Sequence, residues 1–425
     1  MTLETSLAPD VVAIARRLRA RPGLAVLRSD PRGALWPSDA ASSFVASDPV
    51  EVVEAIAPPN GVVVPGWAGR AAAPRWIGYV PYEAFRSLER ARYVPGDRRA
   101  APFVTTPRWH RYDAVLRIDH ASGRVVIESD DTHAASALLD RVHDGSDALD
   151  DTVSVESITA DDDRVHEAAI AKVLELIAAG DTYQVNLARR FHGQLRGPTL
   201  AFFERLFARA PAPYGFHFDA GTHVIAGASP ELAVELRGRA LRTAPIKGTR
   251  PRGVDRASDA AAALELDASE KERAELTMTI DLHRNDLGRV AVAGSVRVPA
   301  APALRAGATV WSRVAEVRAE LEPETRVEAL LRAVLPCGSV TGAPKVRAME
   351  IIAQLELDRR GLYTGAFGYV GRDGGITLAV AIRTAVVRQR EVEYFAGGGI
   401  VWGSDPRRET DETRWKAHQF LRAFS

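Results

Sequence analysis

The sequence predicts an α/β or α+β fold, because short strand-like segments are interspersed with longer segments of helical period. Strand-length apolar segments recur along the 425 residues, and several helical patterns begin or end at a capping residue, a proline or a glycine. Hydrophobic residues make up 46% of the chain, which is enough for a sizeable core. Propensity alone leaves the order of strands in the sheets open.

The first part of the chain is expected to be rich in β-strands. Its first 23 residues mix charged residues with short apolar steps and predict a soluble helix. Strand-like segments follow at residues 24–30, 75–83, 112–120 and 123–129. An acidic stretch of small residues, 144–163, is the best candidate for a boundary. We therefore predict an N-terminal part at 1–155 and a second part at 163–425.

The second part alternates helices and strands. A helix is expected at 164–180, ending at Gly180, with a strand directly after it at 183–191. Helices are also expected at 342–356, where Pro344 suits a first turn, and at 404–424, where Ser404 or Asp405 could act as the cap. Further strands are expected at 222–229, 240–246, 365–371, 376–387 and 392–401.

The composition excludes several classes of function. Lys and Arg together number 55, as do Asp and Glu, so no net charge favours nucleic acid or an anionic membrane surface. Cys337 is the only cysteine, which excludes a disulfide framework and a cysteine metal cluster and fits a reducing cytosol. No apolar run approaches the length of a membrane span. We expect a soluble, cytoplasmic protein whose partners are determined by specific sites.

Two pairs of glutamates have a spacing that places both members on one helix face. Glu272 and Glu275 lie three residues apart, as do Glu409 and Glu412. If the two faces meet, they supply the hard oxygen ligands that Mg²⁺ prefers and leave room for water and an anionic substrate. The alternative is a solvated surface, on which Glu412 would pair with Lys416.

Three other patterns could bind or attack an anionic substrate. The run Gly397, Gly398 and Gly399 could bring backbone N–H groups close to an anion, or could serve only a bulge or turn. Lys247 follows a strand and is a nucleophile, an anion anchor or an exposed loop lysine. Glu231 ends another strand and could protonate a leaving hydroxyl if burial raises its pKa, or could be an ordinary turn residue.

These strings together resemble the chorismate-utilising enzymes, which include aminodeoxychorismate, anthranilate, isochorismate and salicylate synthases. The resemblance runs through DTYQVNLARRF, GASPEL, APIKGTRPRG, EKERAELTMTIDLHRNDLGRV, LPCGSVTGAPKVRAMEII, GLYTGAFGYV, AVAIRT and AGGGIVWGSDPRRETDETRWKA, in that order. It implies two large β-sheets packed as a sandwich with helices outside, and both parts of the chain in one body.

The resemblance also implies roles for the candidate residues. Glu275 and Glu412 would be the principal Mg²⁺ ligands, with Glu272 and Glu409 beside them, and the metal would neutralise the ring carboxylate of chorismate. The residues implied to bind the carboxylate and enolpyruvyl groups of chorismate are Gly248, Thr249, Tyr363, Arg383, Gly397, Gly398, Gly399 and Lys416.

Two positions indicate which reaction the chain resembles. Gln184 stands where water-adding relatives have a lysine base, so the chain is similar to the enzymes that use ammonia. Anthranilate-type enzymes typically read PIAGT, whereas Lys247 in PIKGT resembles aminodeoxychorismate synthases. This implies that Lys247 attacks C2 of chorismate while Glu231 protonates the departing 4-hydroxyl. Ammonia then adds at C4 and expels the lysine amine.

The same resemblance implies a partner protein, and the chain differs from the family at one position. No amidotransferase segment is visible, so ammonia is expected from a separate glutamine amidotransferase subunit, and a separate lyase would be needed to reach 4-aminobenzoate for folate. Thr309 stands where the family commonly has a histidine, and in anthranilate-type enzymes that histidine is associated with the loss of pyruvate.

The first part of the chain resembles the family more weakly, in a region where relatives hold tryptophan. The residues that would line such a pocket are Ser29, Ser43, Phe44, Pro213 and Tyr214. Three alternatives to an aminodeoxychorismate synthase stay open at this point: anthranilate synthase, a secondary-metabolism enzyme that aminates chorismate, and a catalytically silent chorismate-binding subunit.

Overall fold

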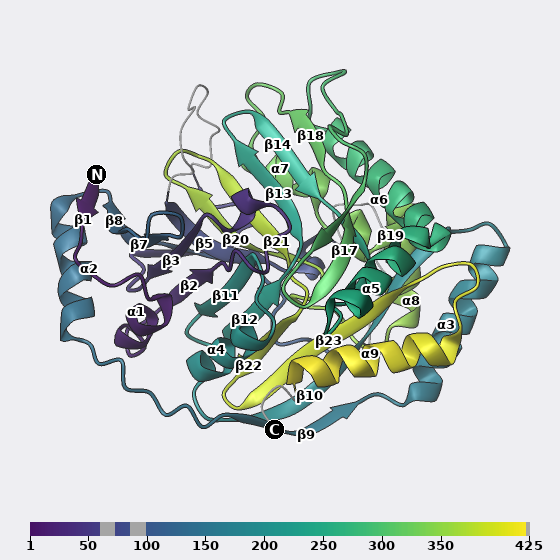
Figure 1. Ribbon diagram of the computed structural model, residues 1–425, viewed down its shortest axis with the longest axis horizontal. Helices are drawn as coiled ribbons and strands as arrows, with labels where there is room; N and C mark the ends of the chain where they lie inside the picture. Colours follow the sequence, from purple (N-terminus) through teal and green to yellow (C-terminus); the bar gives the residue numbers. More distant parts are fainter. Residues whose placement is uncertain (60–72, 86–98, 422–425) are drawn as a thin grey trace.

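The computed structural model describes residues 1–59, 73–85 and 99–421 of the chain (Figure 1). Their strands form one sheet of 12 strands, one of 8 and one of 3, and every pairing within these sheets is antiparallel. Helices lie outside the large sheets. The predicted α/β class, with two large sheets and external helices, is confirmed.

The twelve-stranded sheet takes strands from both predicted parts of the chain. Its order is β1 (Thr2–Glu4), β8 (Val125–Ser129), β7 (Ala114–Asp119), β3 (Ser42–Ala46), β2 (Ala25–Arg28), β11 (Tyr214–Asp219), β12 (Val224–Ser229), β22 (Thr384–Arg388), β23 (Glu391–Ile400), β10 (Gln184–Arg196) and β19 (Gly342–Ala343), with β9 (Ser154–Ala160) also paired to β10.

The eight-stranded sheet also takes strands from both predicted parts of the chain. Its order is β18 (Val317–Glu320), β14 (Ala240–Ala244), β13 (Leu232–Arg237), β21 (Ile376–Val380), β20 (Ala366–Gly371), β5 (Pro74–Val80), β6 (Arg108–Arg111) and β4 (Glu51–Val53). The small sheet has the order β15 (Ile246–Pro251), β17 (Val310–Val314) and β16 (Ala303–Ala306).

The helices are numbered along the chain as in Figure 1. They are α1 (Val11–Arg17), α2 (Thr132–Asp144), α3 (Asp163–Ala178), α4 (Thr199–Arg209), α5 (Arg256–Ala268), α6 (Glu270–Gly288), α7 (Val327–Val334), α8 (Lys345–Leu355) and α9 (Pro406–Leu421), with 3-10 turns η1 (Pro37–Ala40), η2 (Tyr82–Phe85) and η3 (Gly338–Val340).

The apolar residues form layers on both sides of each large sheet. One core cluster lies between the sheets, where Phe216 of the larger sheet stacks on Phe367 of the smaller with ring centroids 4.6 Å apart. A second cluster joins the other face of the twelve-stranded sheet to α1, α2, α4 and α9. A third joins the eight-stranded sheet to α6 and α7. Burial of these faces is the main source of stability.

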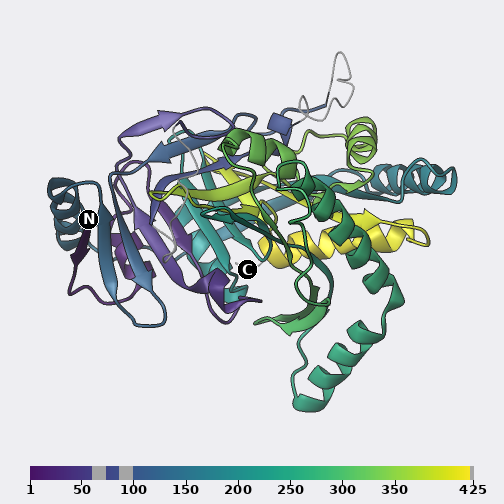
Figure 2. The same ribbon diagram turned by 90° about the horizontal axis from the view of Figure 1, so that it is seen from above.

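Several of the helices outside the sheets lie toward one or the other end of the molecule. Figures 1 and 2 both place α1 and α2 at the N-terminal end, and Figure 1 places α3, α6 and α9 at the opposite end. Helix α9 packs against α3 and against β23. No helix in the described ranges is long and apolar enough to cross a membrane.

Three sequence expectations differ from the structure. The first 23 residues form a short strand and then α1, so only Val11–Arg17 is helical. The segment 376–387 is split between β21 and β22, which belong to different sheets. Part of the acidic stretch 144–163 forms β9, which pairs with β10. An edge strand tolerates this polar sequence because it keeps one side in water.

Candidate functional site

Glu231 and Arg383 lie where the chain crosses between the two large sheets. The chain leaves β12 and enters β13 through Glu231, and it returns from β21 to β22 through Arg383. The Val380 amide donates to the Glu231 carbonyl at 3.0 Å, and the Ala228 amide donates to the Arg383 carbonyl at 3.0 Å. Arg383 has φ of 50°, a left-handed conformation that is uncommon for a residue with a Cβ. The crossings are therefore held side by side.

Lys247 lies in β15 and points into the protein. Its Nζ donates a hydrogen bond to the Ser339 carbonyl at 2.8 Å. Burial lowers the pKa of Lys247, the carboxylates of Glu275 and Glu231 oppose that effect, and the charge of Lys416 adds to it. A lowered pKa raises the fraction of free amine, which is the nucleophilic form.

Glu231 is 4% exposed and lies close to Lys247. Burial raises the pKa of Glu231 to about 7, although Ser339 and the Lys247 ammonium both favour its ionised form. A carboxylic acid with this pKa is partly protonated at neutral pH and can act as a general acid. Its Oε1 atom is buried and accepts no hydrogen bond from the described residues.

The four glutamates of the predicted metal site lie on α6 and α9. Burial raises the pKa of Glu275, and the neighbouring carboxylates of Glu272 and Glu409 raise it further. Burial raises the pKa of Glu409 as well, and Glu412 adds to the effect. These mutual effects mean that the acidic faces of the two helices approach each other. The alternative pairing is also present, since Lys416 lies 2.7 Å from Glu412.

A Mg²⁺ ion at these glutamates would need water and substrate oxygens to complete its coordination shell. Within residues 1–59, 73–85 and 99–421 there is no group of three or more His, Cys, Asp or Glu side chains arranged to hold a metal. Mg²⁺ in enzymes is commonly held by one or two carboxylates, with water and substrate oxygens completing its shell. The approach of Glu275 to Glu409 is compatible with that arrangement.

The three consecutive glycines continue a strand rather than forming a loop or turn. Gly397, Gly398 and Gly399 lie within β23 and pair in regular register with β10. A Cβ at Gly399 would lie 2.3 Å from Nε2 of Gln184, and one at Gly397 would lie 2.9 Å from the Tyr363 hydroxyl. Glycine is required because these polar side chains lie directly against the strand.

Other predicted substrate residues surround this strand. Nζ of Lys416 donates to the Gly397 carbonyl at 2.9 Å. The Tyr363 ring stacks on Phe395 at 5.6 Å, and Arg360 lies 5.6 Å from its centroid. The Arg383 guanidinium makes no hydrogen bond or ion pair with the described residues, and burial lowers its pKa. It is therefore available to a carboxylate.

The strand that carries Lys247 also brings Gly248 and Thr249 to this region. Gly248 has φ of 72° at a bulge, and a Cβ there would lie 2.8 Å from Oε2 of Glu272. Thr249 is exposed. Thr309 is exposed in the turn between β16 and β17, and its carbonyl accepts a hydrogen bond from the Arg252 amide at 2.9 Å.

The residues of the predicted tryptophan pocket lie directly after β2, on β3 and β11, and in the turn before β11. The Ser29 amide donates to Oγ of Ser43 at 3.0 Å, and Phe44 packs on Tyr369 with ring centroids 5.5 Å apart. Pro213 is buried, and Tyr214 follows it at the start of β11. No ligand-binding role for these five residues follows from these contacts, and the pocket stays a prediction.

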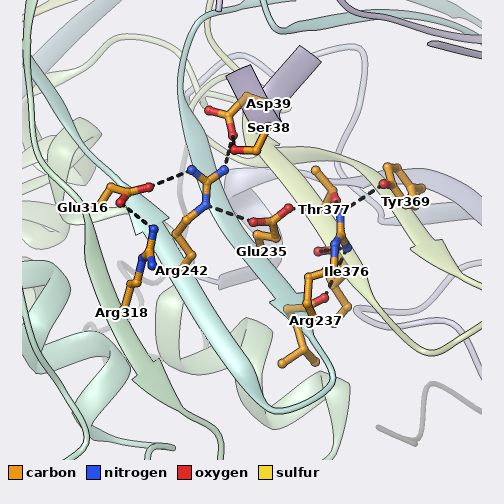
Figure 3. A network of polar contacts seen from close by, with 11 residues as sticks. Ser38, Asp39, Glu235, Arg237, Arg242, Glu316, Arg318, Tyr369, Ile376 and Thr377 are labelled. Atoms are coloured by element: carbon orange, nitrogen blue, oxygen red, sulfur yellow. Dashed lines mark hydrogen bonds and ion pairs between the residues drawn. The ribbon is translucent and has the colours of Figure 1, made fainter. Parts of the chain in front are cut away.

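A buried arginine, Arg242, joins the N-terminal part to the hairpin β13–β14 (Figure 3). Arg242 pairs with Glu235 and Glu316, each at 2.9 Å, and with Asp39 of η1. Burial raises the pKa of Tyr214, and the Asp39 carboxylate raises it further. The hairpin β13–β14 lies between Glu231 and Lys247 in the sequence, so this ion-pair network fixes the element that connects the two residues.

Ser339 contacts the site but was not predicted from the sequence. It lies in η3, and its carbonyl is the acceptor for Lys247. The string LPCGSVTGAPK contains it, but a serine between glycine and valine carries no recognisable spacing or charge. Only the fold brings it to Lys247.

Comparison with known proteins places these features in a family. The pattern that defines chorismate binding enzymes matches residues 34–422. Anthranilate synthase component 1 of Streptomyces coelicolor is 38% identical over 378 residues, covering 82% of this chain and 72% of that protein. The same component of Cereibacter sphaeroides is 34% identical over 395 residues, covering 88% of this chain and 78% of that protein.

Solved structures agree with this similarity. Anthranilate synthase component I of Streptococcus pneumoniae has a TM-score of 0.80 and 28% identity, covering 90% of this chain and 92% of that one. The isochorismate synthase MenF of Escherichia coli has a TM-score of 0.76 at 18% identity, covering 100% of this chain and 94% of that one, so it supports the fold alone.

Proposed function

This chain belongs to the family of chorismate-binding enzymes, and we propose that it replaces the 4-hydroxyl of chorismate with an amino group to give 4-amino-4-deoxychorismate. The observation that carries the proposal is the partly buried Lys247 amine, which donates to the Ser339 carbonyl and lies close to Glu231. Anthranilate-type enzymes typically have alanine at the lysine position, so the lysine is the feature that distinguishes the two reactions.

The pair can divide the substitution into two steps. The free amine of Lys247 forms a bond to C2, both ring double bonds shift by one position, and the C4–O bond breaks as Glu231 supplies the proton that lets the hydroxyl leave as water. Ammonia then forms a bond to C4, both double bonds shift back, and the C2–N bond breaks to release the lysine amine. The net change exchanges ammonia for water.

The remaining site residues would bind and orient the substrate. Arg383 and Lys416 supply positive charge, and Tyr363 closes the side next to the glycine strand. Glu275 and Glu412, with Glu272 and Glu409, would hold Mg²⁺. When bound, the ion supplies positive charge against the ring carboxylate. Ammonia would come from a separate glutamine amidotransferase subunit.

A direct test is to seek the covalent adduct. The protein is incubated with chorismate and Mg²⁺ without ammonia, and the intact mass is measured. We expect a fraction of the chain to gain the mass of chorismate minus water, with the label on Lys247. Lys247→Ala should abolish it, whereas Lys172→Ala, which removes a surface lysine paired with Glu175, should not. Absence of the adduct in protein that turns over with ammonium would refute the proposal.

Anthranilate synthase is the second candidate, because the relatives with 38% and 34% identity carry that name. The two reactions differ in whether the enolpyruvyl group is lost. Product analysis with chorismate, Mg²⁺ and ammonium separates them: release of pyruvate with anthranilate supports the second candidate, and an aminated product that retains the enolpyruvyl group supports the first.

A further inference from the structure

Ser339 lies between the two groups that would carry the chemistry. Its carbonyl accepts the hydrogen bond from Nζ of Lys247 at 2.8 Å. Its hydroxyl is near enough to the Glu231 carboxyl to favour the ionised form of that group, but the contact does not have the distance and angle of a regular hydrogen bond. One residue therefore faces the amine through its backbone and the acid through its side chain.

The polar atoms that face each other here are left without partners. Oγ of Ser339 and Oε1 of Glu231 are both buried, and neither is hydrogen-bonded to a described residue. Buried polar atoms are nearly always paired in proteins, and unpaired ones are concentrated where a ligand or water supplies the partner. A hydroxyl placed between them could accept a hydrogen bond from one and donate to the other, because it has both capacities.

The segment that carries Ser339 is held from several sides. The Thr341 hydroxyl donates to the Cys337 carbonyl at 3.0 Å, and Nη1 of Arg360 donates to the Val340 carbonyl at 3.1 Å. A Cβ at Gly338 would lie 2.8 Å from Cβ of Leu282 on α6, so the turn packs tightly on that helix. The position of Ser339 is thus determined by the fold rather than by its own side chain.

We infer that Ser339 is a third member of the reacting group, whose carbonyl holds the Lys247 amine and whose hydroxyl, with Glu231, binds the substrate hydroxyl that departs. This rests on the proposed function in so far as chorismate is the substrate. It adds Ser339 to Glu231 as a second residue that contacts the departing hydroxyl. It also explains the two orphaned atoms, which the lysine and the acid alone leave unexplained.

The test compares Ser339→Ala, Ser339→Thr and Thr341→Val. Thr341 is the matched control, because its hydroxyl is buried in the same segment but already bonded to a backbone carbonyl. We expect Ser339→Ala to lower kcat about 10- to 100-fold with little change in KM, since the lost contact is made mainly to the departing oxygen. Ser339→Thr should restore most of the rate, and Thr341→Val should lower Tm while keeping kcat within about threefold.

Chorismate consumption is the quantity measured, whatever product forms. A product other than 4-amino-4-deoxychorismate would refute the proposed function and leave this inference intact. A Ser339→Ala chain that folds normally and consumes chorismate at nearly the parental kcat would overturn the inference. So would a Thr341→Val chain that loses kcat as severely as Ser339→Ala.

Discussion

Glu356→Gln should destabilise the protein far more than Glu328→Gln, although each glutamate pairs with an arginine four residues further on. The Glu356 carboxylate accepts hydrogen bonds from the Arg360 guanidinium at 2.6 to 3.2 Å and from the Ala188 amide at 2.8 Å. Arg360 is 0% exposed, whereas the Glu328–Arg332 pair on α7 has side chains 51% and 37% exposed.

The magnitude follows from burial. Removing one partner of a buried pair leaves an uncompensated charge and typically costs about 3–5 kcal/mol, whereas an exposed pair contributes about 0–1 kcal/mol. An unfolding entropy of about 2.1 cal/mol/K per residue gives about 0.9 kcal/mol/K for 425 residues. Glu356→Gln should therefore lower Tm by about 3–6 K, and Glu328→Gln by about 1 K or less.

Urea unfolding and calorimetry of the parent and both variants measure this difference. Glutamine keeps the volume of Glu356 and one acceptor oxygen, so the comparison isolates the charge. The reasoning is refuted if the two variants lose similar free energies of unfolding. That result would mean that the carbonyls of Val340 and Asn186 and the Thr364 hydroxyl, which also accept from Arg360, satisfy its charge by themselves.

Three further predictions concern metal, ammonia and pH. Glu275→Gln should abolish Mg²⁺-dependent turnover while Glu175→Gln, on the surface of α3, should not; similar activities in a Mg²⁺ titration would argue against the ligand assignment. Ammonium should support turnover by the purified chain and glutamine should not, and strong glutamine-dependent activity without a partner would contradict this. Burial raises the pKa of Glu393 to about 7. The free energy of unfolding that neutral Glu393 contributes is therefore fully present below the ordinary glutamate pKa near 4.3, and it is lost as pH rises through about 7. The parent should then lose about 2 kcal/mol more than Glu393→Gln between pH 5.5 and 8.5, and parallel urea curves would contradict that.

The sequence predicts most strands but not their division between sheets. The segment 376–387 is mostly apolar, apart from Thr377, Arg383 and Thr384, and it contains neither proline nor glycine, so no strong breaker in it predicts the change of sheet. The break comes from the left-handed backbone of Arg383, which the surrounding sheets hold in place. Sheet order likewise depends on pairings between distant segments, which local periodicity cannot reveal.

The candidate site was predictable where residue spacing or a resemblance identified a residue. The glutamate pairs share helix faces by their spacing, but the approach of α6 to α9 depends on packing between segments far apart in the sequence. The strand expected at 392–401 contains the glycine run and agrees with β23, but the side chains of Gln184 and Tyr363 that lie against the glycines come from distant segments that local sequence does not reveal. Ser339 contributes through its backbone carbonyl, which every residue has, so its identity could not reveal the contact.

The site consists of two parts that differ in rigidity: the paired crossings between the sheets and the helices outside them. Glu231 and Arg383 belong to connections that are anchored at both ends in a continuous sandwich, so their separation can change only if the sheets slide over the core between them. The carboxylates instead stand on α6 and α9, which rest on the outer faces of different sheets. Adjustment to a substrate is therefore expected in the helices, as small shifts of the carboxylates toward a fixed acid and a fixed guanidinium.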